Sequence, residues 1–224
     1  MKRIASLFAA TLIAVLACSA FSGLPAIAGP EAAAKGAPVD SLTILEKAVA
    51  KDSTKFDNLY KLGVLYLDRE RMQEAAKVFW KANQLRPKNL KVLVNMGVAA
   101  DAIGHAEEAQ DWYRQALAVS PADSVAQCRL ASSFYAQGKY DQSMTILRDL
   151  VAKRPRAHCA YFTMGVAFAD AGIYRDAIRM WHKVIELAPD SPEALSAKES
   201  IDVLEKFLQQ TPPAPATGTT GTTK

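Results

Sequence analysis

Hydrophobic positions recur with helical spacing along most of the chain, most clearly between His158 and Ser191. Gly172 interrupts the spacing near the middle of this stretch, and Pro189 ends it. A glycine readily takes the left-handed conformation that ends a helix, and a proline cannot continue one. The pattern therefore predicts two short helices joined by a tight turn. Their apolar faces carry Tyr161, Met164, Gly165 and Phe168 in the first helix and Ala177, Trp181 and Val184 in the second.

The same pattern occurs four times without insertion at a spacing of 34 residues, which divides residues 56–191 into four equal copies. Such repetition predicts an array in which each helix pair packs on its neighbours. The remaining copies place Leu59, Leu62, Gly63, Tyr66, Ala75, Phe79, Ala82 and Pro87 in 56–89; Leu93, Met96, Gly97, Ala100, Ala109, Tyr113, Ala116 and Pro121 in 90–123; and Gln127, Leu130, Ala131, Phe134, Ser143, Leu147, Leu150 and Pro155 in 124–157.

These residues follow the pattern W-x2-L-G-x2-Y, A-x3-F and P, which resembles the tetratricopeptide repeat (TPR). The resemblance implies an all-α fold, a right-handed superhelical solenoid of antiparallel helix pairs. In the same frame, residues 40–55 correspond to an N-terminal half repeat. Ser191 and Pro192 predict the start of a capping helix over 192–210. Residues 29–39 form a predicted linker, and residues 211–224 have too little to bury to be ordered.

Three copies carry a glycine in the middle of the first helix, which costs about 1 kcal/mol relative to alanine. A large aromatic residue sixteen positions later is expected to lie over the bare backbone. In copy 124–157 both positions change together, to Ala131 and Leu147, as volume matching in a packed core requires. The expected glycine–aromatic pairs are Gly63 with Phe79, Gly97 with Tyr113 and Gly165 with Trp181.

The N-terminus has the pattern of an export signal, with Lys2 and Arg3 before an apolar run that ends near Cys18. The run is short for a membrane-spanning helix. Two processing routes fit. Cleavage after the Ala-Ile-Ala segment removes residues 1–28 and leaves Gly29 first. Alternatively, Val-Leu-Ala-Cys resembles a lipobox, which implies removal of residues 1–17 and lipidation of Cys18. Both routes take the protein out of the cytoplasm.

Composition and charge argue against several function classes. Half of the residues are hydrophobic and 22% are charged, which excludes disorder of the main body. Acids and bases are interleaved, and removal of the leader lowers the formal net charge of +4 by two. The one local basic cluster, Lys153, Arg154 and Arg156, is placed to complement a helix dipole. Nucleic-acid binding, which usually needs a basic face, is not expected.

The three histidines, His105, His158 and His182, lie in separate repeats or turns without a nucleophile arrangement, and no phosphate-binding glycine loop occurs. We therefore expect neither an enzyme nor a cofactor. Cys128 and Cys159 lie on first helices, where neighbouring helices pack about 8–10 Å apart. A disulfide needs Cα atoms within about 7 Å, so free thiols are favoured, with a disulfide as the alternative in an exported protein. The spacing gives no metal signature.

The TPR resemblance also implies that certain positions of the first helices face a concave groove. An exposed apolar band rimmed by polar groups is typical of a binding surface. Asn95 and Arg129 match the TPR pattern that binds a C-terminal carboxylate, but Tyr60, Val64 and Val125 depart from it. We therefore expect a partner helix or extended segment, with Arg129 facing one acid. The predicted groove residues are Tyr60, Lys61, Val64, Val94, Asn95, Val98, Arg129, Tyr135, Phe162 and Val166.

Taken together, the sequence predicts a non-catalytic scaffold that binds a protein partner in a bacterial cell envelope. Membrane attachment is expected only if Cys18 is lipidated. In that case the protein resembles lipid-anchored factors that assemble pili or outer-membrane proteins. A non-catalytic subunit of an envelope enzyme complex, for cell-wall or thiol handling, is a further alternative. Part of the groove could instead be covered by the linker, the half repeat or a second copy in a homo-oligomer.

Overall fold

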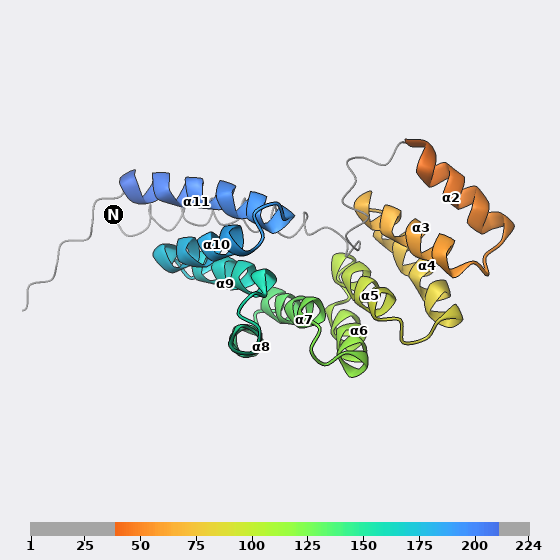
Figure 1. Cartoon of the computed structure of the whole chain (residues 1–224), viewed down its shortest axis with the longest axis horizontal. Coiled ribbons are helices and arrows are strands. Elements are labelled where there is room, and N and C mark those ends of the chain that lie inside the picture. Colours follow the sequence, from red (N-terminus) through yellow and green to blue (C-terminus); the bar gives the residue numbers. More distant parts are fainter. Residues whose placement is uncertain (1–38, 211–224) are drawn as a thin grey trace, which may run out of the picture.

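The computed structural model describes residues 39–210, and within that range every regular element is an α-helix (Figure 1). The predicted leader, Cys18, most of the predicted linker and the tail lie outside the described residues. The helices are α2 (Val39–Lys51), α3 (Phe56–Asp68), α4 (Met72–Leu85), α5 (Leu90–Ala102), α6 (Ala106–Val119), α7 (Ser124–Ala136), α8 (Tyr140–Lys153), α9 (His158–Asp170), α10 (Tyr174–Leu187) and α11 (Pro192–Gln210).

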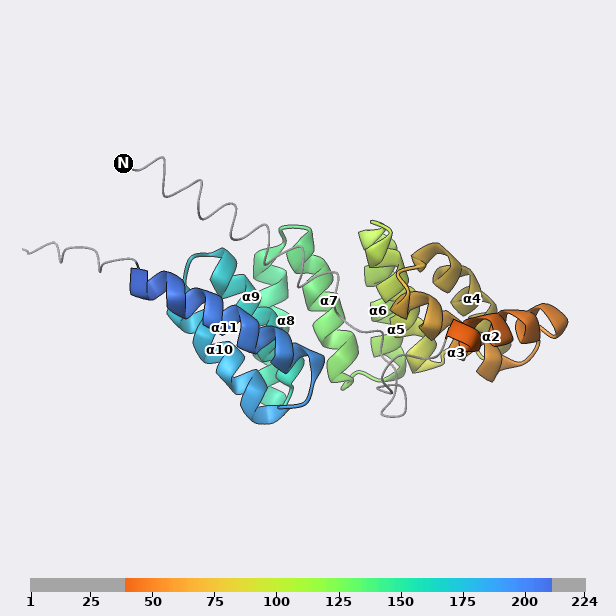
Figure 2. The ribbon, with the colours of Figure 1, turned by 90° about the horizontal axis from the view of Figure 1, so that it is seen from above.

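The helices form an extended array in which each one packs against the helices next to it in the chain. Figures 1 and 2 show α2 at one end of the array and α11 at the other. The predicted all-α solenoid is therefore confirmed. The first helices of the four pairs, α3, α5, α7 and α9, begin at the first residue of each 34-residue copy. The helix pairs thus follow the periodicity of the hydrophobic pattern.

Aromatic rings cover the mid-helix glycines of three repeats. A Cβ atom added at Gly165 would lie less than 3.0 Å from the Trp181 indole, and Gly63 and Gly97 are covered in the same way by the rings of Phe79 and Tyr113. In the remaining pair of helices, α7 and α8, the corresponding alanine and leucine are both fully buried. The predicted volume matching is therefore present in all four repeats.

The turns within each pair use a left-handed residue at one fixed position. Gly104, Gly138 and Gly172 have φ values of +86°, +72° and +75°. In the first repeat the same position is Glu70, which has a φ of 58°. A side chain at this φ costs about 1–2 kcal/mol, so the first repeat carries strain that the other three avoid.

Side chains cap three of the inter-repeat helix starts. Asn89 accepts a hydrogen bond from the Val92 amide at 3.2 Å, and Asp123 accepts one from the Ala126 amide at 2.7 Å. At the start of α11, the Ser191 hydroxyl accepts a hydrogen bond from the Ala194 amide at 3.1 Å, as predicted. Such caps satisfy backbone donors that a helix leaves unpaired. They position each new pair directly after the previous one.

Candidate partner-binding groove

The four first helices lie next to one another along the array, because α3 contacts α5, α5 contacts α7 and α7 contacts α9. These helices carry the side chains that the TPR resemblance assigns to the concave face. We call this set of side chains the concave strip. It consists of Tyr60, Val64, Val94, Asn95, Val98, Asp101, Arg129, Tyr135, Phe162, Val166 and Asp170. The junctions differ in the chemistry that holds them.

At the junction of α3 and α5, Tyr60 lies beside Asn95. Asn95 is fully buried, and neither its Nδ2 nor its Oδ1 atom has a hydrogen-bond partner. Burial raises the pKa of Tyr60, and the neighbouring Asn95 amide partly offsets that rise. A buried amide without partners costs about 1–3 kcal/mol. This junction therefore buries an amide that lacks close hydrogen bonds and has the Tyr60 hydroxyl beside it.

At the junction of α5 and α7, Asp101 is held by two hydroxyl groups. The Ser133 hydroxyl donates to its carboxylate at 2.8 Å and the Tyr113 hydroxyl at 3.0 Å. Burial raises the pKa of Asp101 to about 6, against the opposing effects of these hydrogen bonds and of the Arg129 charge. Burial in turn raises the pKa of Tyr113 well above its usual value. Asp101 thus titrates near neutral pH.

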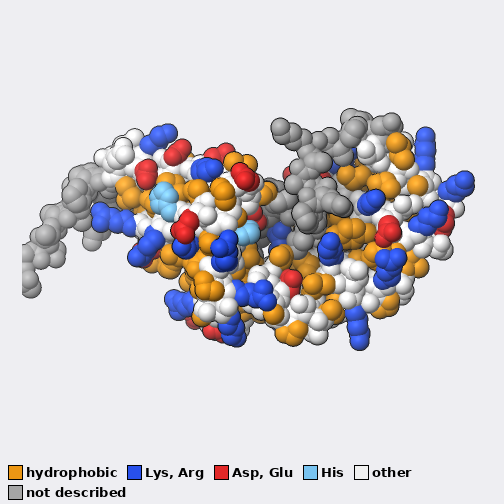
Figure 3. Space-filling model, viewed as in Figure 1, with side chains coloured by type: hydrophobic (Ala, Val, Ile, Leu, Met, Phe, Trp, Pro, Cys, Tyr) orange, Lys and Arg blue, Asp and Glu red, His pale blue; other side chains and the backbone are white. Residues whose placement is uncertain are grey.

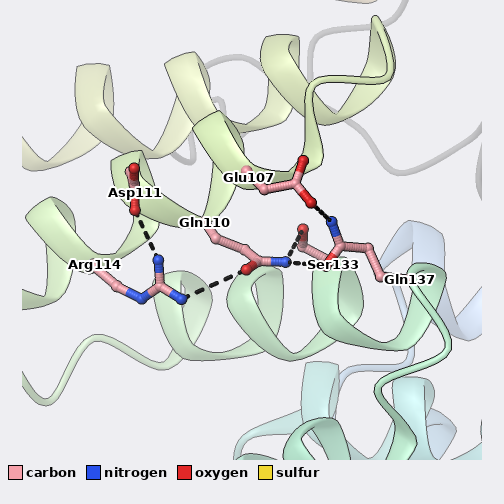
Figure 4. Close-up of polar contacts among 6 residues, drawn as sticks. All are labelled: Glu107, Gln110, Asp111, Arg114, Ser133 and Gln137. Atoms are coloured by element: carbon pink, nitrogen blue, oxygen red, sulfur yellow. Dashed lines mark hydrogen bonds and ion pairs between the residues drawn. The ribbon is translucent and has the colours of Figure 1, made fainter.

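A polar network continues from this junction towards the outer helices (Figure 4). Gln110 on α6 donates to Gln137 on α7 at 2.9 Å and to Ser133 at 3.4 Å, and Gln137 donates to Glu107 at 2.9 Å. Arg114 completes the network by donating to Gln110 at 3.5 Å. This network was not predicted from the sequence. The available signal was Gln110 itself, which occupies a position that is apolar in the other three repeats.

The junction of α7 and α9 contains a disulfide between Cys128 and Cys159, with a Cα–Cα distance of 6.1 Å. The preference for free thiols was therefore wrong, because the usual spacing of 8–10 Å separates helix axes, whereas Cα atoms on the facing sides of two helices lie closer together. Two further contacts join the same helices. The Tyr135 hydroxyl donates to Asp170, and the Ser132 and Thr163 hydroxyls lie 3.3 Å apart. Burial and the Asp170 carboxylate raise the pKa of Tyr135.

The apolar part of the concave strip is more buried than the sequence analysis expected. Val64, Val94 and Phe162 expose only 7%, 2% and 6% of their surface. The prediction of an exposed band is wrong for these three residues, because Val64 and Val94 pack among side chains of the neighbouring helices and Phe162 packs against α10 and α11. The half-buried predicted groove residues are Tyr60, Val98, Arg129, Tyr135 and Val166, while Lys61 is exposed.

A metal site and a membrane-spanning helix are two other features that a chain of this kind could carry. Over residues 39–210, no group of three or more His, Cys, Asp and Glu side chains is arranged to hold a metal ion. In the same part of the chain, no helix combines the length and hydropathy that crossing a bilayer requires.

The fold defines a class, that of all-α repeat proteins built from antiparallel helix pairs. Two family models described as tetratricopeptide repeats match the chain, one over residues 56–89 and the other over residues 91–193. The chain therefore belongs to the tetratricopeptide repeat family. Proteins of this family generally serve as non-catalytic scaffolds for protein–protein interactions.

Curated relatives are much longer than this chain. Tetratricopeptide repeat protein 7B of Homo sapiens is 30% identical over 128 residues, which are 57% of this chain and 15% of that protein. Anaphase-promoting complex subunit 3 of Schizosaccharomyces pombe is 24% identical over 165 residues, which are 74% of this chain and 24% of that protein. The chain thus spans less than a quarter of the length of either relative.

Solved structures share the fold at low sequence identity. TTC0263, a thermophilic TPR protein in Thermus thermophilus, has a TM-score of 0.62 at 18% identity and covers 74% of this chain and 89% of its own. YrrB, described as a TPR protein with an unusual peptide-binding site, has a TM-score of 0.50 at 23% identity and covers 71% and 82%. At these identities the likeness establishes the fold alone.

Proposed function

We propose that the protein is a non-catalytic scaffold of a bacterial cell envelope that holds a helix or an extended segment of a partner protein along the concave strip. The observation that carries this proposal is the buried, unpartnered amide of Asn95 near the N-terminal end of the strip. A bound main chain would offer one carbonyl oxygen and one N–H group, which are the two partners this amide lacks. Tyr60 is half-buried beside Asn95 and would contact such a segment.

The charges along the strip favour an acidic group in that segment. Arg129 is half-buried between Asp101 and the rest of the strip, and Lys61 is exposed on α3. A carboxylate of the partner near Arg129 would gain a charge-assisted hydrogen bond. The proposed ligand is therefore an apolar segment with one acidic side chain rather than a free C-terminus.

Photo-cross-linking tests the proposed groove. A photoreactive amino acid at half-buried Val98 or Val166 should cross-link a partner in the native host, whereas the same group at Leu195 on α11, which is 58% exposed, should not. Asn95→Ala should reduce cross-linking from Val98 without lowering the melting temperature, since truncation removes an unsatisfied buried amide. Equal cross-linking from all three positions would contradict the proposal that the partner binds along the concave strip. A charge introduced by Phe162→Glu would not test the groove, because Phe162 is only 6% exposed and the change would disturb the packing as well.

The envelope location rests on the leader pattern and gains support from the disulfide, because disulfides persist in oxidising compartments. Intact mass spectrometry of the protein from its native host tests this part of the proposal. A chain that begins at a lipid-modified Cys18 would place the scaffold on a membrane. A chain that begins near Gly29 without lipid would make it a soluble exported adaptor. A cytoplasmic chain that keeps residues 1–28 would contradict export.

A further inference from the structure

A second surface lies on the side of α5 opposite the concave strip, where a groove of about 440 Å³ opens between α4 and α6. Met96 and Ala100 on α5 and Ile103, directly after its last residue, form the floor and are spaced three to four residues apart. Val94 and Val98 of the concave strip lie on the opposite side of a helix with 3.6 residues per turn. Trp80 on α4 and Trp112 on α6 line the two sides of the groove.

The groove is apolar and incompletely covered. Trp80 exposes 55% of its surface, although two of its neighbours on the floor, Met96 and Ala100, are buried. An exposed tryptophan beside a recess leaves a large apolar ring in water, and burying that ring against a partner would be favourable. Hydrophobic side chains reach the surface over the N-terminal repeats in Figure 3, with Lys and Arg side chains among them.

The next groove along the array, between α6 and α8, shows how the same position looks when the chain fills it. Counted from the start of each repeat, Ala76, Trp80 and Ile103 in the first groove correspond to Gln110, Arg114 and Gln137 in the second. These three polar side chains bond to one another in the network of Figure 4. The second groove is therefore satisfied from within, whereas the first presents an apolar recess.

The charges at the rim of the first groove indicate what it accepts. The acids on the α6 side are already engaged, since Glu108 accepts a hydrogen bond from the Trp112 indole at 3.2 Å and Asp111 one from Arg114 at 2.7 Å. On the α4 side, Lys77 and Lys81 line the groove four residues apart, and neither forms an ion pair with another described residue. The rim thus offers two cations to a ligand.

We propose that this groove is a second docking site, which takes a partner protein segment presenting an aromatic or large aliphatic side chain flanked by carboxylates. The apolar side chain inserts between Trp80 and Trp112, and the carboxylates pair with Lys77 and Lys81. A recess can accommodate one inserted side chain, whereas a membrane presents a flat surface that does not fill it. Because this site and the concave strip lie on opposite sides of α5, one protein can hold two segments at once.

Tryptophan fluorescence provides the test. The probe is a synthetic peptide with a central Phe-Leu pair between two Asp-Glu pairs, and its control carries lysines in place of the acids. Trp181 is 1% exposed, so a fluorescence change on titration reports Trp80 and Trp112. We expect the acidic peptide to bind the full chain and the lysine peptide not to bind.

Variants copied from the neighbouring groove sharpen the test. Trp80→Arg introduces the residue found at the same position of the next two repeats. It should weaken binding of the acidic peptide at least about tenfold. Lys77→Glu with Lys81→Glu should reverse the preference between the two peptides. Leu195→Arg, at an equally exposed position on α11, should leave binding unchanged.

Three other outcomes would contradict the proposed docking site. Undiminished binding of the acidic peptide to Trp80→Arg, with an unchanged helical circular dichroism spectrum, would show that the groove is not involved. Binding to anionic phosphatidylglycerol vesicles but not to the peptide would identify a membrane surface instead. A dimer that dissociates in Trp80→Arg, measured by sedimentation, would show that a second copy of the chain covers the groove.

Discussion

The first and third junctions of the array are held by different chemistry. Where α3 meets α5, the contact is apolar apart from the Asn95 amide and the Tyr60 hydroxyl, and both flanking repeats carry a glycine covered by an aromatic ring. Where α7 meets α9, a disulfide and a tyrosine–aspartate hydrogen bond join the helices. The repeat before that junction has the smallest packing pair, Ala131 with Leu147. The covalent link therefore stands beside the smallest of the four packing pairs.

The largest effect is expected from removing the link. Cys128→Ala with Cys159→Ala should lower the free energy of unfolding by about 3–4 kcal/mol, as expected for a loop of this length. Urea unfolding followed by circular dichroism measures the loss, with a free-thiol assay on the native protein as control. Two reactive thiols in the native protein and an unchanged midpoint would contradict the junction described above.

Overpacking a glycine should have the next largest effect. Gly165→Leu forces a side chain into the Trp181 indole and should cost on the order of 1–3 kcal/mol. Adding Trp181→Ala to this variant makes room for the leucine, so the double variant should lose less than the two single changes together. Thermal melting of the four proteins gives the comparison. Additive losses would mean that the two residues do not share one space.

The repeat boundaries could be predicted from the sequence because Gly63, Phe79 and their equivalents return at a fixed interval. The pairing of Cys128 with Cys159 could not, since it depends on the local spacing of two helices, which periodicity does not define. The burial of Val94 and Phe162 has the same cause. The network around Gln110 needs residues from two repeats at once, and no single motif contains them.

The middle junction holds a carboxylate, Asp101, between two hydroxyl groups, and its stability should depend on pH. The folded-state pKa of Asp101 is raised to about 6, so between about pH 4 and 6 the folded chain binds more protons at this carboxyl than the unfolded chain. Its contribution to stability therefore falls as pH rises through this window, by on the order of 2 kcal/mol.

Comparing Asp101→Asn with the wild type isolates this effect. The difference in unfolding free energy between the two proteins should change between pH 4 and 6, since the variant cannot titrate. Asp202→Asn, at an exposed position on α11, is the matched control and should show a constant difference. A constant difference for Asp101→Asn as well would mean that its carboxyl is not buried.

The smallest effect concerns the turn of the first repeat. Glu70→Gly should raise the free energy of unfolding by about 1 kcal/mol, because glycine removes the strain of a positive φ. The reverse change, Gly104→Glu, should cost a similar amount at the equivalent turn. Melting temperatures of both variants test this. Equal melting temperatures would indicate that the first turn relaxes to a negative φ.

The disulfide also determines how the array carries a mechanical load. If the chain is pulled from both ends, tension passes directly from α7 to α9 through the sulfur atoms and bypasses the segment between them. The two cysteines are 31 residues apart, so the fully stretched chain is shorter by roughly 100 Å than its reduced form. Helix α8, which lies inside this loop, remains unloaded even when the helices on either side of the loop are pulled out.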